Sequence, residues 1–491
     1  MEHIQKRSQS ELEAENEVLR GENERLSGQV AELTAKIEML TRKITELEKK
    51  LGQNSSNSSL PPSSDLFGRK AKTNSPSRKE RRAMERKPGK QPGSEGKNLA
   101  QVTNPDQVII HVPEACDSCG ADLYGAKVIS EEVRQVFDVI KPKMVVTEHR
   151  VIKLRCSCGN QCESAFPIEA RAQTCYGPRI RANALYLMAR QHLPLERTKE
   201  AISDLLGLNC STGFLDDVYN QGAKGLDTFI DEITSQLAEA EVVHFDETSI
   251  KVKNTRHWLH VASTKELTLL HANRSRGKGA TEAVGVLPSF GGVSVHDRLA
   301  MYFDYEKSTH AVCGAHLLRN LASVAVVDNQ REWATKMSGL LIEMRSTANE
   351  AREAGLVRIA PYQLTSYLSR YDAIVREGLD ANPTPTARKR DSLERESYNL
   401  ASAFCKLRSE VTLFASDLRV PFTNNQAERD LRMAKLQQKI SGSLRSAHGA
   451  ERLAKVRSYI STASKHQLDT LDVLTELFLG HPWMPPAPTR T

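Results

Sequence analysis

The fold of this chain is decided by Val242-Val243-His244-Phe245-Asp246, a short apolar run that ends in a carboxylate. A second apolar run, which begins at Gly292, ends in the same way at Asp297. A third acidic residue, Glu428, lies in a helix-like segment. Two carboxylates at strand ends and one on a helix can converge on a pair of Mg²⁺ ions, which prefer oxygen ligands. A single Asp after a strand is usually a turn residue or a helix cap, so the prediction depends on all three together.

The sequence around this run predicts an ordered series of strands. Three successive strands with short turns are expected at 242–245, 258–262 and 267–270, and a helix near 280–287 precedes the strand that ends before Asp297. The ribonuclease H-like order consists of three antiparallel strands, a helix and a fourth strand that is parallel to the first. The first and fourth strands are neighbours in that order, so Asp246 and Asp297 should meet. Glu247 should face away from Asp246 because side chains alternate along a strand.

The interval between Asp297 and Glu428 is too long for a simple loop, and it is mostly helical in pattern. An inserted helical region is therefore expected at about 310–420. After Glu428, basic residues recur at three- and four-residue steps and form one helix face: Arg429, Arg432, Lys435 and Lys439. A solvated helix face is the plain alternative, but a neighbouring phosphate backbone explains the pattern better.

The bulk properties of the chain narrow its class. A length of 491 residues suggests about three or four domains, and the net charge of +7 is unevenly spread, which indicates a polyanionic partner such as nucleic acid. No run approaches ~18 apolar residues, and the N-terminus lacks the apolar core of a signal peptide, so a cytoplasmic protein without membrane spans is expected. Nine cysteines, several in close pairs, favour zinc and free thiols over disulfides.

Residues 1–51 have the pattern of a leucine zipper. One seam is formed by leucines every seven residues: Leu12, Leu19, Leu26, Leu33, Leu40 and Leu47. The other seam combines β-branched residues with Asn16 and Asn23, which favours a parallel two-stranded coiled coil in fixed register. Gly21 and Gly28 should weaken its first half. The alternative is a long amphipathic helix packed on its own domain.

Residues 52–104 are expected to be a disordered basic linker. The Asn- and Ser-rich start has almost nothing to bury, and Arg69 to Lys97 contains eleven Lys or Arg against three Glu. This segment is either a flexible arm that neutralises DNA phosphates, through residues such as Arg78, Lys79, Arg81 and Arg82, or a solvated tether.

Residues 105–175 contain two cysteine pairs, each followed by Gly: Cys116 with Cys119, and Cys156 with Cys158. Thiolates in such turns converge on a tetrahedral zinc ion, so a small zinc-binding domain with one ion is expected. The second pair has a single intervening residue, and Cys162 could replace Cys158 as the fourth ligand. Reduced structural cysteines are the alternative. Strand-like alternation is expected within 128–151.

Residues 176–240 look helical. One helix should open at Pro194, the pattern breaks at Gly207, and Ser211 with Thr212 could cap the next helix. The spacing suits a helix-turn-helix that places a helix in a DNA groove, although plain helical packing explains it equally well. A catalytic domain at 241–465 and a C-terminal tail at 466–491 complete the division. The fold class is thus multidomain α+β, with a coiled coil, a zinc-knuckle domain, a helical DNA-binding region and a ribonuclease H-like α/β core.

With these features the chain resembles the transposases of the insertion-sequence 66 family, which belong to the acidic-triad (DDE) class. The resemblance spans nearly the whole chain, including the zipper, the Ser-rich linker and both cysteine pairs. Its later motifs are His244 to Thr248, Asn424 to Arg429 and Arg457 to Thr462. The last two are highly specific.

The resemblance implies roles for individual residues. The metal-binding acidic residues fall on Asp246, Asp297 and Glu428, and Cys313 with His316 forms a Cys-x-x-His motif that supports the core near the insertion. Lys435 fits a basic residue that contacts DNA. Thr423 departs from the pattern, because many relatives have Asp there, but it is not one of the three ligands.

The implied function is a DNA transposase that binds the terminal inverted repeats of its element and cuts and joins strands with two Mg²⁺ (or Mn²⁺) ions and one structural Zn²⁺. The implied partners are inverted-repeat and target DNA, further copies of the chain joined as a dimer or higher oligomer through the zipper, and small accessory proteins of the same element. The expected location is the bacterial nucleoid. Two rivals are a non-catalytic zinc-and-zipper DNA-binding regulator and a metal-dependent nuclease that cuts without joining.

Overall fold

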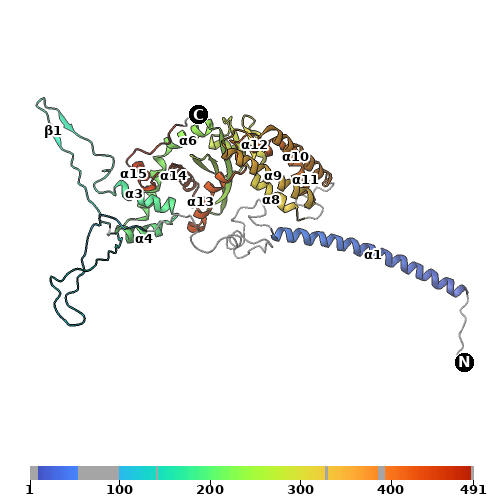
Figure 1. Ribbon diagram of the computed structural model, residues 1–491. Coiled ribbons are helices and arrows are strands. Elements are labelled where there is room, and N and C mark those ends of the chain that lie inside the picture. The colour runs from blue at the N-terminus through green and yellow to red at the C-terminus, as the bar shows by residue number, and fades with distance from the viewer. Residues whose placement is uncertain (1–8, 53–98, 140–141, 327–329, 385–392, 488–491) are drawn as a thin grey trace. The chain divides into compact units, whose positions relative to one another are not determined.

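The computed structural model describes residues 9–52, 99–139, 142–326, 330–384 and 393–487 (Figure 1). Two compact units are distinguished. One includes 147–202 and 209–487, and the other includes 99–146 and 203–208. In the part of the chain that is described, no helix is both long and apolar enough to cross a membrane.

The zipper segment is one helix, α1, which runs over Gln9–Gly52. It passes through Gly21 and Gly28 without a break. Its seam leucines are largely exposed in this single chain, with Leu26 at 47% and Leu33 at 57%. An apolar seam of this kind is typical of a helix that pairs with another, and the coiled coil stays a prediction.

The strands expected within 128–151 are absent from the described residues of that segment, so this prediction was wrong. The alternating apolar side chains there remain exposed, with Val136 at 92% and Val145 at 83%. Alternation predicts a strand only where a partner strand and a core receive it, and among the described residues neither lies beside this segment. A short antiparallel hairpin follows instead, formed by β1 (Lys153–Arg155) and β2 (Gln161–Glu163) around the second cysteine pair.

The helical region expected at 176–240 is confirmed. It consists of α3 (Pro178–Leu185), the π-helical turn Tyr186–Arg190, α4 (Leu195–Leu206), α5 (Thr212–Lys224) and α6 (Asp227–Glu239). Ser211 caps α5 as predicted, since its side chain accepts a hydrogen bond from Phe214 N at 3.1 Å. Gly207 ends the preceding helix in the left-handed region at φ +66°. Within the predicted C-terminal tail, α15 (Thr470–Phe478) packs against α3.

A five-stranded sheet has the order β5-β4-β3-β6-β7. Its strands are β3 (Val242–Val252), β4 (Thr255–Ser263), β5 (Thr268–Asn273), β6 (Val293–His296) and β7 (Thr309–Val312), with α7 (Lys278–Val284) between β5 and β6. The first three strands are antiparallel, and β6 lies parallel to β3. The predicted strand series and the neighbouring of its first and fourth strands are therefore confirmed. The fifth strand, β7, was not predicted.

The first strand is longer than predicted, so Asp246 does not stand at its end. The hairpin with β4 pairs Asp246 with Val261 and continues to Val252 opposite Thr255. The parallel ladder with β6 is shorter and stops at His244 opposite Val295. Asp246 thus follows the parallel ladder but lies within the antiparallel one.

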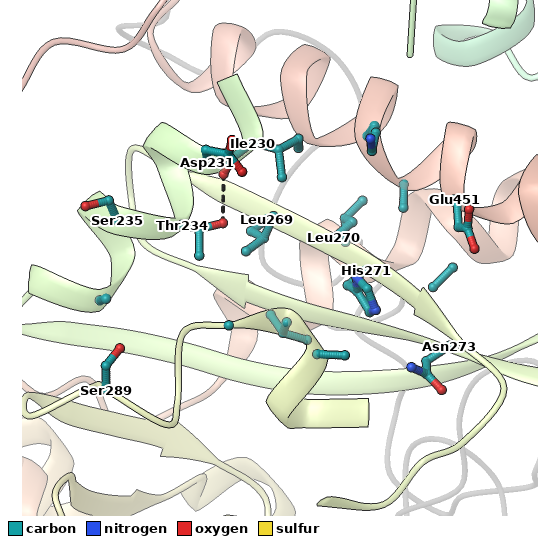
Figure 2. A pocket seen from close by; sticks show the side chains of 17 residues that line it. Ile230, Asp231, Thr234, Ser235, Leu269, Leu270, His271, Asn273, Ser289 and Glu451 are labelled. Atoms are coloured by element: carbon teal, nitrogen blue, oxygen red, sulfur yellow. Dashed lines mark hydrogen bonds between the residues drawn. The ribbon is translucent and has the colours of Figure 1, made fainter. Parts of the chain in front are cut away.

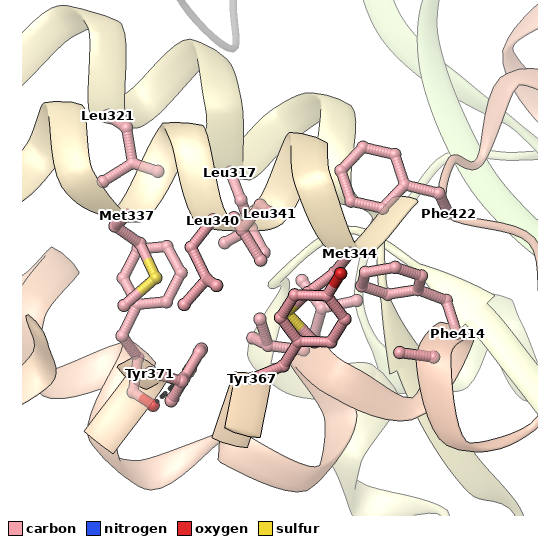
Figure 3. Packing of buried hydrophobic residues seen from close by; sticks show 14 of the residues in the cluster. Leu317, Leu321, Met337, Leu340, Leu341, Met344, Tyr367, Tyr371, Phe414 and Phe422 are labelled. Atoms are coloured by element: carbon pink, nitrogen blue, oxygen red, sulfur yellow. Dashed lines mark hydrogen bonds between the residues drawn. The ribbon is translucent and has the colours of Figure 1, made fainter. Parts of the chain in front are cut away.

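The expected insertion is helical. It contains α8 (Gly314–Val324), α9 (Arg331–Glu353), α10 (Pro361–Asp380), α11 (Leu393–Lys406) and α12 (Arg408–Ser416). Figure 3 shows its interior, where Met337 and Leu341 of α9 pack with Tyr371 of α10. The cluster is continuous with Val293 and Val295 of β6, so the insertion and the sheet share one core.

Two further helices cover the other strands. α13 (Asn425–Ser441) packs on β3 and β4, where its Ala427 and Leu431 join one buried cluster with Ile250 and Val252. α14 (Ala447–Lys465) lies beside β5 and supplies hydroxyl groups to its backbone. Ser458 Oγ accepts from Leu270 N at 2.8 Å, and Thr462 Oγ1 accepts from Thr268 N at 3.1 Å.

Candidate active site

Asp246 and Asp297 occupy equivalent positions on neighbouring strands. The parallel register pairs Val242 with Val293 and His244 with Val295. Each Asp lies two residues beyond that last pair, Asp246 still within β3 and Asp297 just after β6. The sheet therefore brings these two predicted residues to one edge, as the sequence indicated.

The alternation of β3 directs Asp246 toward α13. Ile250 and Val252, which share its face of the strand, pack on that helix. His244 has the same parity, and its Nδ1 lies 2.8 Å from Asn424 Oδ1, just before the helix begins. Glu428 is in the first turn of α13. The helix consequently brings the third predicted carboxylate to the face on which Asp246 lies.

Glu247 lies on the opposite face of β3, which confirms that prediction. Its buried carboxylate accepts a hydrogen bond from Tyr302 Oη at 2.6 Å and pairs with Arg276 Nη2 at 2.6 Å. Burial and the charge of Asp297 raise the pKa of Glu247, against the opposing effects of Tyr302 and Arg276. Glu247 already has a cation, so it is not a free metal ligand.

Asp246 experiences the negative charges of three neighbouring carboxylates. Burial raises the pKa of Asp246 well above its usual value, and the charges of Glu247, Asp297 and Glu428 raise it further. A hydrogen bond from Glu247 N to Asp246 Oδ1, at 2.8 Å, opposes this effect. Carboxylates that repel one another in this way are suited to a divalent cation, which would remove the repulsion.

Glu428 faces His316 and Arg319 at distances longer than a hydrogen bond. Its Oε1 lies 3.8 Å from His316 Nδ1 and 3.6 Å from Arg319 Nη2. Both Glu428 Oε1 and His316 Nδ1 are buried atoms without a hydrogen-bond partner in the described structure. Burial and then Arg319 lower the pKa of His316, so the neutral ring is favoured. The unsatisfied oxygen fits a metal ligand that still needs its cation.

Asn424 ties the start of α13 to β3. Its fully buried side chain donates from Nδ2 to Phe245 O at 2.7 Å, while its Oδ1 meets His244 Nδ1. Its backbone N–H donates to Cys313 Sγ at 3.1 Å, and its carbonyl accepts from Glu428 N at 3.3 Å. These contacts fix Glu428 relative to the strand that carries Asp246.

Cys313 and His316 lie beside Glu428, as the supporting role predicts. The possible ligand atoms of these three residues lie within 4.8 Å of one another. Burial raises the pKa of Cys313 to about 11, so the group is a thiol that accepts from Asn424 N. The bond from Asn424 N to its sulfur lets Cys313 support the start of α13.

The basic face of α13 divides into two parts. Arg429, Arg432 and Lys439 are exposed. Lys435 turns back to the sheet, because its Nζ donates to Ser249 O at 2.5 Å and lies 3.3 Å from Ser249 Oγ. Burial lowers the pKa of Lys435. The other basic residues predicted to contact DNA, in the arm from Arg78 to Arg82, lie outside the described residues.

Each cysteine pair forms a tight turn. Gly120 N donates to Cys116 O at 2.8 Å, and Gly159 N donates to Cys156 O at 2.9 Å, with both glycines at positive φ. Hydrogen bonds from the backbone of Cys119 lower the pKa of Cys116, and those from Cys158 lower the pKa of Cys156. A turn that favours thiolates fits a zinc knuckle.

Three residues around the carboxylates were missed by sequence reasoning: Arg276, Tyr302 and Arg319. Arg276 and Tyr302 reach Glu247 from 29 and 55 residues further along the chain, and no local pattern indicates such contacts. Arg319 follows His316 by one helical turn, a spacing that places both on one face of α8.

One cavity in the described structure lies away from these carboxylates. It measures about 770 Å³ and is lined by α6, β5, α14 and the end of α7, with Thr234, His271 and Glu451 at its wall (Figure 2). Asp246, Asp297 and Glu428 do not line it. A polymer such as DNA needs an open surface at its reacting bond, so the cavity is not required for the chemistry of the carboxylates.

Comparison with known proteins gives matches over most of the sequence. Residues 173–452 match a family described as "Transposase IS66 family", and residues 113–159 match the "zinc-finger binding domain of transposase IS66". Residues 2–100 match a family of unknown function. An uncharacterized protein, y4hP, of Sinorhizobium fredii (strain NBRC 101917 / NGR234) is 24% identical over 400 residues, which cover 74% of this chain and 70% of that protein.

Proposed function

The chain belongs to the IS66 family of transposases and is a DNA transposase, and we propose that Asp246, Asp297 and Glu428 are its catalytic metal ligands. The observation that carries the proposal is the shared register of the two Asp residues, together with the approach of Glu428 on α13. The sheet order and this placement support a ribonuclease H-like core of the acidic-triad class.

The three carboxylates would hold two Mg²⁺ or Mn²⁺ ions. When bound, such ions activate a water or a 3′-hydroxyl and stabilise the leaving oxygen in phosphodiester chemistry. Asp246 must be ionised to serve; burial and the neighbouring carboxylates raise its pKa, and a bound divalent cation would offset both effects. Asn424 and the contact of Lys435 with Ser249 hold α13 in place, so that Glu428 stays on the face of β3 to which Asp246 points.

The remaining parts of the chain would bring the DNA to this site. We assign one structural zinc ion to the thiols of Cys116, Cys119, Cys156 and Cys158, with Cys162 as the alternative fourth ligand. The zinc-binding region at 105–175 and the helices of 176–240 would recognise the inverted repeats. The α1 helix would join copies of the chain as a coiled coil, and the linker would neutralise phosphates.

The decisive experiment is cleavage and joining of end-bearing DNA with Mg²⁺ or Mn²⁺. Changing Asp246 or Asp297 to Asn, or Glu428 to Gln, removes a contribution of several kcal/mol, so cleavage should fall roughly a thousandfold or more. Binding to the DNA ends should persist. The matched control is Asp304→Asn, since Asp304 is exposed and paired only loosely with Lys278 at 4.0 Å.

The same assay separates the rival functions. A nuclease would cut without joining, and a non-catalytic regulator would do neither while still binding DNA. Near wild-type cutting and joining by the Asp246→Asn protein would show that the proposed triad is wrong.

A further inference from the structure

The turn between β3 and β4 and the loop after α13 are joined by backbone hydrogen bonds. Lys253 N donates to Leu444 O at 2.7 Å, and Leu444 N donates to Lys251 O at 3.0 Å. Val252 and Leu444 form a parallel bridge between these bonds. The two segments therefore make one surface, although about 190 residues separate them in the sequence.

The exposed charges of this surface have one sign. Lys251, Lys253 and Arg256 lie on the turn, and Arg445 lies on the loop, all exposed. Residues 248–257 and 431–446 contain no Asp or Glu. We call these four basic side chains the hairpin surface. A solvated face of a soluble domain usually mixes both signs, so this one indicates a polyanion.

The nearest acidic residue on α13 does not neutralise this surface. Asp430 points inward, where its Oδ2 pairs with Lys465 Nζ at 2.9 Å and accepts from Ser263 Oγ at 2.7 Å. Its side chain is only 8% exposed. The positive charge of the hairpin surface is therefore presented to solvent without a nearby exposed carboxylate on that helix.

The backbone that presents these charges is fixed. Lys253 adopts a left-handed conformation at φ +52°, and Thr255 Oγ1 donates to Val252 O at 2.9 Å across the turn. A turn that is already ordered loses less conformational entropy when it binds a ligand. Preorganised cations of this kind suit repeated phosphates at regular spacing.

We propose that the hairpin surface binds the phosphate backbone of duplex DNA a fixed distance from the reacting bond. α13 connects it to Glu428, and the 13 residue steps from Glu428 to Ser441 correspond to about 20 Å along the helix. At about 3.4 Å per base pair, this distance is roughly six base pairs.

The proposal rests on the proposed active site for its reference point, but its test measures binding alone. Lys251→Gln combined with Arg256→Gln, in the full-length protein without added Mg²⁺ or Mn²⁺ so that cleavage cannot occur and zinc is retained, should weaken binding to end-bearing duplex DNA. Two lost phosphate contacts should lower the slope of log affinity against log salt by about 1.8. Lys253 is left unchanged because its backbone conformation is unusual.

The matched control removes two exposed charges elsewhere, by Lys265→Gln combined with Arg358→Gln, and should leave the slope at the wild-type value. Lys251→Arg combined with Arg256→Lys keeps both charges and should also keep it. A hairpin variant with the wild-type slope, or one that matches the control double variant, would overturn the proposal.

Phosphate ethylation interference locates the contact. Ethylation roughly six base pairs from the cleavage position should interfere with binding by the wild-type protein and cease to interfere with the hairpin variant. Interference that is unchanged in the variant would contradict the assignment. Failure of the proposed catalytic triad can be distinguished from failure of the hairpin-surface proposal. It would appear as persistent cleavage by Asp246→Asn, while the salt slopes stay as predicted.

Discussion

Asn424 and His244 lie 180 positions apart in the chain and share a buried contact of 2.8 Å between Oδ1 and Nδ1. The Asn424 amide also bonds Phe245 O, one residue before Asp246. This single side chain thus determines how the helix that carries Glu428 meets the strand that carries Asp246. Its role is to position the carboxylates.

Asn424→Ala should therefore impair both stability and metal use. It leaves His244 Nδ1 and Phe245 O buried without partners, at a cost of about 1–3 kcal/mol for such a group. Cleavage should fall at limiting Mn²⁺ and recover partly at high Mn²⁺, because Glu428 is displaced but still present. Denaturant unfolding and a Mn²⁺ titration of cleavage measure the two effects.

Asn425→Ala is the matched control, since Asn425 is the adjacent residue of the same type but is exposed. It should leave both measurements near wild type. An Asn424→Ala protein with reduced stability but an unchanged Mn²⁺ dependence would reduce Asn424 to a structural residue.

Asp246→Asn should stabilise the protein when metal is absent. A carboxyl whose pKa is raised on folding binds its proton more tightly in the folded state, so its contribution to stability falls as pH rises through the interval above its unfolded pKa. The melting temperatures of the variant and the wild type should be equal in acid, and that of the variant should be higher at neutral pH. A difference of 1 kcal/mol corresponds to about 2–4 °C for a domain of this size.

Melting curves recorded without added Mg²⁺ or Mn²⁺ across the pH range test this sign. Mg²⁺ or Mn²⁺ should stabilise the wild type and narrow the difference, because an ion that binds the folded state adds stability. Asp304→Asn should change neither curve, since Asp304 is exposed. A lower melting temperature for Asp246→Asn without added Mg²⁺ or Mn²⁺ would show that Asp246 is not destabilised by its neighbours.

The zinc assignment predicts about one zinc ion per chain in freshly purified, reduced protein. Cys116→Ser or Cys156→Ser should lower that content and weaken DNA binding more than it lowers the stability of the catalytic core. Elemental analysis is the measurement, and Cys405→Ser is the control because this exposed cysteine lies in the helical insertion. Protein without zinc would exclude the assignment.

Removal of residues 1–51 should leave a folded protein that self-associates less and pairs DNA ends less well, because the seam of α1 is exposed in the single chain. Asn23→Val should stabilise the coil and loosen its choice of partner number. Light scattering measures the oligomeric state of the deletion variant and of Asn23→Val. An unchanged oligomer after the deletion would show that α1 does not join copies of the chain.

The sequence predicted the features that depend on local pattern. The apolar runs before Asp246 and Asp297 identified two neighbouring strands, and alternation placed Glu247 on the opposite face. The length of β3 could not be read from its apolar run, because pairing with β4 extends the strand through Val252.

Tertiary contacts explain the other differences. Lys435 looked like one more member of a basic face, but Ser249 draws its ammonium group to the sheet. Residues 128–151 alternate like a strand, yet their apolar side chains lack a core to cover. For Lys435 the deciding neighbour is Ser249, which lies 186 residues away in the sequence. For residues 128–151 no strand forms, because no core covers their apolar side chains in the described structure.

The hydroxyl groups of Ser458 and Thr462 affect how copies of the chain can associate when they are close together. By accepting from Leu270 N and Thr268 N, they occupy the backbone donors that a bare edge strand would offer to another molecule. Copies of the chain gathered at high local concentration on one stretch of DNA are thereby kept from merging their sheets at these donors. α14 thus protects the edge strand β5 from aggregation, independently of any surface that joins copies of the chain.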